Sequence, residues 1–190
     1  LIPNRTAPLI ASVVVVRTGV IHETPALNGI SHMLEHLLFN GTARRTQEAL
    51  YDEQDRYGII NNASTGAEHT AYFVLAARET AGRALDLQAD MLFGSIFPED
   101  KLGKEREIIV NEIAKDQTQD ETIMSELFSA RLYHPSSLAL PVIDRVRGLN
   151  RAARLCAFGL YAPPNAVLLR AHGVEAAFGN LFRSLGDLRE

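Results

Sequence analysis

The chain has 190 residues, 46% of them hydrophobic, which is enough for one domain with a sizeable core but too few for two domains of ordinary size. Its 19 basic and 23 acidic residues give a net charge of -4 without any basic run, so nucleic acid is not an expected partner. The single cysteine, Cys156, excludes an internal disulfide and a cysteine zinc site. Any metal must therefore be held by histidine and carboxylate groups.

The first predicted element is a strand over residues 9–18, which is rich in valine and nearly continuously apolar. This composition predicts a strand buried on both faces and ended by Gly19. The run is far shorter than the roughly 18 residues of a membrane span. His22 and Glu23 follow in a loop, where we expect solvated polar groups rather than ligands. Residues 1–4 resemble the end of a strand whose first part is absent, so the lack of a signal peptide does not define the compartment.

Residues 28–42 form the stretch with the clearest chemical content. Asn28 or Ser31 can start a helix, apolar residues follow at helical density, and Asn40 with Gly41 can end it. The segment therefore predicts a short buried helix fed by the preceding strand.

Three polar residues lie within this apolar helix: His32, Glu35 and His36. The histidines are spaced i, i+4, so their imidazoles project from one face and can reach one ion. Glu35 lies beside that face, where a carboxylate can take a proton from water without being a ligand. A single histidine among apolar neighbours is more often a hydrogen-bonded core residue, but burying all three groups uncompensated costs several kcal/mol. The pattern His-x-x-Glu-His mirrors the His-Glu-x-x-His helix of zinc proteases.

A surface helix is predicted over residues 46–57, stopped by Gly58, and a hairpin over residues 61–76. The residues Asn62, Ala63, Ser64 and Thr65 are small or polar, which is typical of an edge strand. Such an edge is either solvated or free to pair with an extended peptide. His69 is interpreted as a structural strand residue.

Helices are next predicted over residues 80–93 and 98–116, the second opening with proline and acidic residues. On the second helix, Glu105 and Glu112 are seven residues apart and share a half-apolar face, whereas Glu107 turns to the solvent side. Two carboxylates on such a face are either paired with cations or serve a metal site.

The remaining predicted elements complete an α+β domain in which helices flank a mostly antiparallel sheet. They are an amphipathic helix over residues 122–132 ended near Pro135, a helix over 150–161, a strand over 165–172 and a helix over 174–185. The whole chain, 1–190, is interpreted as a single domain.

Several separated motifs agree with one family. The chain resembles the catalytic N-terminal domain of the pitrilysin (M16) zinc metallopeptidases, which include insulin-degrading enzyme and the mitochondrial processing peptidase β subunit. The matching motifs are Asn28-Gly29 before His32-x-x-Glu35-His36, Phe39-x-Gly41-Thr42, Asn62-Ala63-x-Thr65, Glu68-x-Thr70-x-Tyr72, Glu105-x6-Glu112, His134-Pro135 and Tyr161-x-Pro163-x-Asn165. Their order and separations follow the family over nearly the whole chain.

The resemblance implies that His32, His36 and Glu112 hold a single Zn²⁺ with a fourth position open to water, as in catalytic zinc sites. It implies that Glu35 is the general base of an endopeptidase of the inverzincin type and that Glu105 orients a histidine ligand. Asn62–Thr65 then corresponds to the edge that binds an extended peptide.

The family builds a working enzyme from two homologous domains, in one chain or in two subunits. We therefore expect this chain to be a fragment or one subunit of a pair, with low activity alone. Because bacterial members are often exported, we expect the periplasm or cell envelope. The alternatives are a non-catalytic scaffold or binding subunit of the same fold, and an unrelated core in which Glu112 lies far from His36. Non-catalytic members lose ligands and base, which are all present here.

Overall fold

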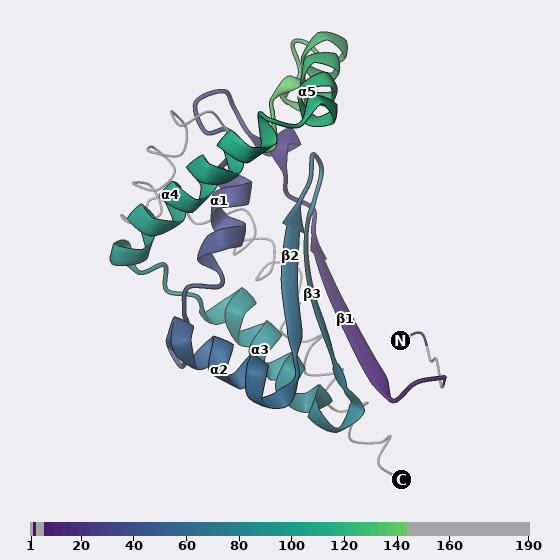
Figure 1. The fold of residues 1–190 in the computed structure, drawn as a ribbon, viewed down its shortest axis with the longest axis vertical. Coiled ribbons are helices and arrows are strands. Elements are labelled where there is room, and N and C mark those ends of the chain that lie inside the picture. The colour runs from purple at the N-terminus through teal and green to yellow at the C-terminus, as the bar shows by residue number, and fades with distance from the viewer. Residues whose placement is uncertain (1, 3–5, 144–190) are drawn as a thin grey trace.

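The computed structural model describes residues 2 and 6–143 and has an α+β architecture (Figure 1). The strands are β1 (Leu9–Val16), β2 (Ile60–Thr65) and β3 (Thr70–Ala77). The helices are α1 (Ile30–Leu37), α2 (Gln47–Tyr57), α3 (Ala81–Gly94), α4 (Glu99–Asp116) and α5 (Asp120–Leu132), with short 3-10 turns at Val20–His22, Arg78–Thr80 and Ser137–Ala139. The predicted fold class is confirmed, whereas the elements predicted over 150–161, 165–172 and 174–185 lie outside the described residues.

The described sheet has the antiparallel order β1-β3-β2, so the predicted hairpin forms and β1 adds to its far side. Along β3, alternate side chains are buried beneath the helices, as a sheet with one covered face requires. The expectation that β1 is buried on both faces is wrong. Val13 and Val15 are 60% and 57% exposed, because the described helices cover only the opposite face of the strand.

The core lies between the sheet and the helices. One cluster joins β1 and β3 to α3 through buried side chains such as Val16, Tyr72 and Leu85. A second cluster joins α1 to α4, which lie side by side in Figure 1, and consists of Ile30, Met33, Leu34, Leu37, Leu102 and Ile109. Full burial of each aliphatic side chain contributes about 1.5–3 kcal/mol, so this seam fixes α1 against α4.

The loop after α1 is tied to α3 by a network of ion pairs. Arg45 donates to Asp86 at 2.6 Å, to Asp90 at 2.7 Å and to Glu53 on α2 at 2.9 Å. Arg44 adds a bond to Asp90 at 2.8 Å. Asp90 also accepts a bond from Thr42 at 2.8 Å. The end of the α1 segment is thereby held to the helical layer.

Helix α2 begins and ends at residues that favour helix ends. Thr46 caps α2 by accepting a bond from the Ala49 N–H, and Gly58 ends it with φ 60, a conformation that glycine adopts without strain.

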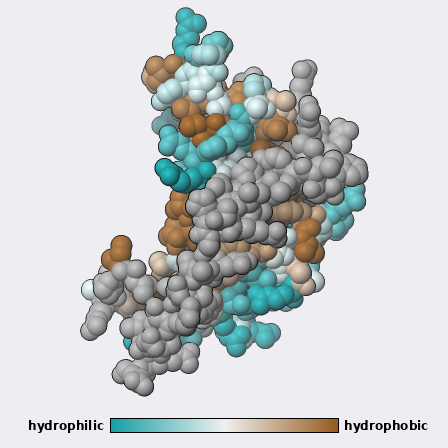
Figure 2. Space-filling model, turned by 180° about the vertical axis from the view of Figure 1, so that it is seen from behind, coloured by the Kyte–Doolittle hydropathy of each residue, from teal (hydrophilic) through white to brown (hydrophobic). Residues whose placement is uncertain are grey.

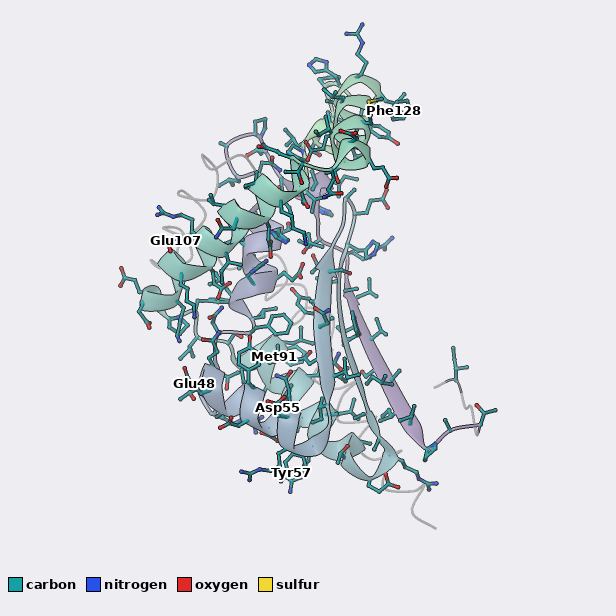
Figure 3. The ribbon with its side chains drawn as sticks, viewed as in Figure 1. Glu48, Asp55, Tyr57, Met91, Glu107 and Phe128 are labelled. Atoms are coloured by element: carbon teal, nitrogen blue, oxygen red, sulfur yellow. The ribbon has the colours of Figure 1, made fainter. Side chains whose placement is uncertain are left out.

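The predicted amphipathic helix is present as α5, but none of its residues is buried. Hydrophobic side chains cover part of the region around α5 in Figure 2, and Phe128, labelled in Figure 3, is 65% exposed.

Within the part of the chain that the structure describes, no helix combines the length and the apolar character needed to cross a membrane.

Candidate metal centre

Helix α1 places its apolar side chains and its histidines on different sides. Met33 and Leu37 are fully buried in the seam with α4, which leaves His32 and His36 at the rim of that seam. Because α4 runs along the same seam, Glu112 comes within reach of both histidines. The predicted i, i+4 histidine pair therefore forms on a real helix, and its rings pack edge to face with centroids 4.6 Å apart.

The structure brings His32, His36 and Glu112 together. One nitrogen of each imidazole and one carboxylate oxygen lie within 4.8 Å of one another. The Glu112 carboxylate oxygen is 3.8 Å from His32 Nε2 and 3.4 Å from His36 Nε2. The unrelated-core alternative, which requires Glu112 to lie far from His36, is therefore wrong.

These donors fit a zinc ion. Two imidazoles and one carboxylate are the donor set of open, three-ligand zinc sites. The group is held by the packing of α1 on α4, and Glu112 is half-exposed, so the site is open on one side. The buried Nδ1 of His32, on the other side of the ring from the Nε2 that faces Glu112, has no hydrogen-bond partner among the described residues.

Glu105 contacts one of these imidazoles. Its carboxylate is buried and lies 3.1 Å from His36 Nδ1. Burial opposes ionisation of Glu105, but the hydrogen bonds with His36 and Asn40 outweigh it and lower its pKa, so the group is an acceptor. In the neutral form of His36 the proton is then on Nδ1, which leaves the Nε2 lone pair on the side of Glu112. Glu107, by contrast, projects from the outer side of α4 in Figure 3, as the sequence predicts.

The two histidines have opposite pKa shifts. Burial and, to a smaller extent, the neighbouring His36 together lower the pKa of His32 to about 4. Burial also acts to lower the pKa of His36, but its hydrogen bond with Glu105 and the charges of Glu112, Glu105 and Glu35 together raise it. His32 is therefore neutral at neutral pH, the form in which an imidazole binds metal.

Glu35 lies beside the ligand group without belonging to it. Its carboxylate accepts a short hydrogen bond from the hydroxyl of Thr65 on β2. Burial raises the pKa of Glu35. The hydrogen bond from Thr65 and the charge of His36 oppose this rise, and the charge of Glu112 adds a smaller contribution to it. A carboxyl group with a raised pKa in this position is suited to taking up and releasing a proton.

The predicted peptide-binding edge is the strand β2, which lies at one edge of the described sheet. Asn62 and Ser64 are exposed, whereas Ala63 and Thr65 are partly buried and face the helical layer. The side-chain oxygen of Asn62 accepts a bond of 2.8 Å from the Ala63 N–H. Asn61 donates to the Met91 sulfur on α3, labelled in Figure 3, which holds β2 over the helices.

One residue near the site behaves differently from its prediction. Glu23, expected in solvent, is only 7% exposed and accepts hydrogen bonds from the start of α1. The helix starts after Gly29, which has φ 83, rather than after a side-chain cap by Asn28 or Ser31. The available sequence signal for this role was an acidic residue a few positions before a helix. Glu23 lies too far from the helix start along the sequence to be recognised as a cap.

Comparison with known proteins identifies the family. Residues 1–145 match the family model described as Insulinase (Peptidase family M16). The chain belongs to peptidase family M16.

Relatives of this M16 chain are named zinc proteases. It is 34% identical over 179 residues to the Bacillus subtilis (strain 168) protein named "Uncharacterized zinc protease YmxG", covering 92% of this chain and 44% of the relative. It is 31% identical over 140 residues to the mitochondrial-processing peptidase subunit beta of Dictyostelium discoideum, covering 73% of this chain and 30% of the relative. These relatives support a peptidase function and zinc as the family's cofactor. The M16 chain spans less than half the length of each.

Solved structures share the fold. Pitrilysin matches with a TM-score of 0.71 and 22% identity, covering 81% of the M16 chain and 17% of pitrilysin. A protease from Helicobacter pylori matches with a TM-score of 0.71 and 23% identity, covering 84% and 39%. An M16 inactive domain from Pseudomonas fluorescens matches with a TM-score of 0.66 and 16% identity, covering 78% and 38%. The fold therefore occurs both in a protein described as a protease and in a domain described as inactive, and activity must be argued from the residues of the site.

Proposed function

We propose that this chain is the catalytic half of a zinc-dependent endopeptidase of the His-x-x-Glu-His type. The observation that carries the proposal is the convergence of donor atoms from His32, His36 and Glu112 within 4.8 Å, with a separate carboxylate, Glu35, beside them. A scaffold protein has no need of this combination, because each group is costly to bury.

The proposed ligands are the Nε2 atoms of the two histidines and the carboxylate of Glu112, holding one Zn²⁺ per chain. A bound zinc ion would lower the pKa of a water molecule and polarise the carbonyl of the peptide bond. Glu105 keeps the His36 ring in the orientation and tautomer that direct its Nε2 toward the ion.

Glu35 is the proposed general base. Its carboxylate takes the proton from the attacking water and then gives it to the leaving amine. Thr65 holds one oxygen of that carboxylate through its hydroxyl, which fixes the direction in which the other oxygen points. The raised pKa of Glu35 makes its carboxylate a stronger base toward that water.

The proposed substrate is a peptide or an unstructured protein segment in an extended conformation. Such a segment can add to the exposed edge of β2 at Asn62–Thr65 through backbone hydrogen bonds. Because Thr65 also contacts Glu35, a peptide on this edge is brought beside the base. An extended backbone is recognised in this way with little dependence on its side chains.

A second homologous domain, in the same polypeptide or in a partner subunit, is part of the proposal. The chain spans 44% of one relative and 30% of another, which leaves room for such a half in proteins of their length. We expect the chain alone to bind zinc but to hydrolyse peptides slowly.

The test measures zinc content by elemental analysis and peptide hydrolysis on the same samples of wild type, His36→Ala and Glu112→Gln. The expected result is about one zinc per wild-type chain and a large loss in both variants. Glu107→Gln is the matched control on the same helix and should keep its zinc. A wild-type chain that takes up no zinc even from excess metal would contradict the proposal and favour the scaffold alternative.

A further inference from the structure

Glu23 is a buried carboxylate that the proposed chemistry does not use. It lies between the turn Val20–His22 and α1 and is 7% exposed. One carboxylate oxygen accepts bonds from Gly29 N–H at 2.7 Å and from the Asn28 side-chain amide at 2.8 Å. The other accepts a bond from Ser31 N–H at 2.9 Å. All three donors belong to the start of the helix that carries His32.

Helix α1 needs such a partner because it cannot cap itself. It has eight residues, and its N-cap, Gly29, has no side chain to accept a bond from the first free N–H groups. The φ of 83 at Gly29 also favours glycine over residues that could cap. A carboxylate at a helix N-terminus both accepts these bonds and complements the helix dipole. Glu23 therefore accepts hydrogen bonds from N–H groups at the start of α1, although it lies outside the helix.

The loop that carries Glu23 is itself fixed to the hairpin of β2 and β3. Ile21 N–H donates to the Ala67 carbonyl at 2.9 Å, and the backbone of Gly19 packs so closely on Gly66 and Ala67 that a larger residue would clash. The Ser137 hydroxyl donates to the Ile21 carbonyl at 2.8 Å. Glu23 thus connects the start of α1 to the turn that follows the proposed peptide-binding strand.

A second connection runs through Asn28. Its amide donates to Glu23 and also, at 2.9 Å, to the Pro141 carbonyl. The start of α1 is therefore held from two directions, by the hairpin through Glu23 and by the segment after α5 through Asn28. Among the described residues, no ion pair forms at Glu23, so the carboxylate is committed to these hydrogen bonds.

We propose that Glu23 is a positioning residue for the metal centre, which holds the first turn of α1 so that His32 and His36 converge with Glu112. Ser31, which it binds, directly precedes His32 in the chain. If the turn shifts or frays, the histidine nitrogens lose their common point with the carboxylate on α4. The proposal rests on the zinc site of the proposed function.

The competing explanation is that Glu23 stabilises the fold and has no specific effect on the metal centre. Thr46 provides the matched control, because it caps α2 through a single bond to Ala49 N–H and lies outside the ligand group. Glu23→Gln and Thr46→Ala both remove helix-capping bonds. Both are expected to lower the melting temperature of the metal-free chain by roughly 2–4 °C. They are expected to differ in zinc affinity.

The experiment measures the zinc dissociation constant of each variant by competition with a chromophoric chelator. Glu23→Gln is expected to weaken zinc binding by roughly 10-fold or more, in the range of other residues that orient metal ligands. Thr46→Ala should stay within about 2-fold of wild type. Asn28→Ala, which removes the bonds to Glu23 and to the Pro141 carbonyl and leaves the carboxylate in place, is expected to weaken binding about 3-fold. It provides the answer if Glu23→Gln does not fold.

Equal zinc affinity in wild type, Glu23→Gln and Asn28→Ala would overturn the proposal and leave Glu23 a fold-stabilising cap. Hydrogen exchange of the amides in residues 29–37 gives a readout without metal. These amides should exchange faster in Glu23→Gln and at wild-type rates in Thr46→Ala, and unchanged rates in Glu23→Gln would also overturn the proposal. If the wild type binds no zinc, the proposed function fails, and the exchange data still decide whether Glu23 anchors the helix.

Discussion

Two carboxylate clusters in this domain resemble each other in composition and differ in what neutralises them. Beside α3, Asp86, Asp90 and Glu53 are each bonded to Arg45, whose guanidinium is a permanent charge. Beside α1, the described ion pairs of Glu105 and Glu112 are with histidines alone. The carboxylates of the first cluster are neutralised by arginine, whereas the nitrogen and oxygen lone pairs of the second cluster are available to a cation.

The difference shows why a count of acidic residues does not locate a site. Arginine gives up no proton and accepts no bond, so its cluster can only hold the fold together. Imidazoles can be neutral, and the two Nε2 atoms near Glu112 then have lone pairs that can bind a metal ion together. The structural cluster should therefore affect stability and the histidine cluster should affect metal binding and catalysis.

The largest expected effect is on hydrolysis in Glu35→Gln. Removal of the base should lower the rate about 10²–10⁴-fold, and zinc should remain because Glu35 lies outside the ligand group. Peptide hydrolysis and zinc content are measured on the same sample. Loss of zinc in this variant would show that Glu35 is a ligand and would reassign the base.

Arg45→Ala should act on the other cluster. It removes the donors to three carboxylates. One of these, Asp90, has a side chain only 5% exposed and, among the described residues, keeps Arg44 and Thr42 as partners. The free energy of unfolding should fall by about 1–3 kcal/mol, measured by urea denaturation. Arg44→Ala, at a more exposed arginine, should cost less. A selective loss of zinc affinity in folded Arg45→Ala would show that the arginine cluster also affects metal binding, and would contradict its assignment to stability alone.

Thr65→Val tests the contact between the edge strand and the base. Loss of the hydroxyl leaves the Glu35 carboxylate less firmly oriented, so hydrolysis should fall about 10-fold while zinc content stays at the wild-type level. Thr65→Ser, which keeps the hydroxyl, should retain most of the activity. Equal rates in the valine and serine variants would exclude a role for this hydrogen bond.

The smallest effect concerns the pH dependence of stability. Burial opposes ionisation of Asp86 and Asp90, but hydrogen bonds from Arg45 and Arg44 outweigh it and lower both pKa values. Their stabilisation is thus fully present above the unfolded pKa of about 4 and is lost as the pH falls through the folded values. The stability gap between wild type and Arg45→Ala, measured by denaturation from pH 7 to pH 3, should narrow below about pH 4. A stability difference that stays constant from pH 7 to pH 3 would contradict the lowered pKa values of Asp86 and Asp90.

Several elements could be predicted because their signals are local. Gly58 ends α2 as expected, and the helix begins one residue after the predicted start at residue 46. The i, i+4 spacing of His32 and His36 needs nothing beyond a helix to place both rings on one face. The prediction that β1 is buried on both faces was wrong, because composition does not reveal which faces of a sheet other elements cover.

The sequence by itself determined the donor types, their helical spacing, the family and the α+β class, since these depend on neighbours in the chain or on the order of motifs. The family resemblance also predicted that Glu112 meets both histidines, and the structure shows this contact. Only the tertiary structure decided that Thr65 binds Glu35 and that Glu23 is buried against the start of α1. These contacts join residues on different elements. Their geometry is set by the packing of α1 between α4 and the hairpin, and no local propensity encodes it.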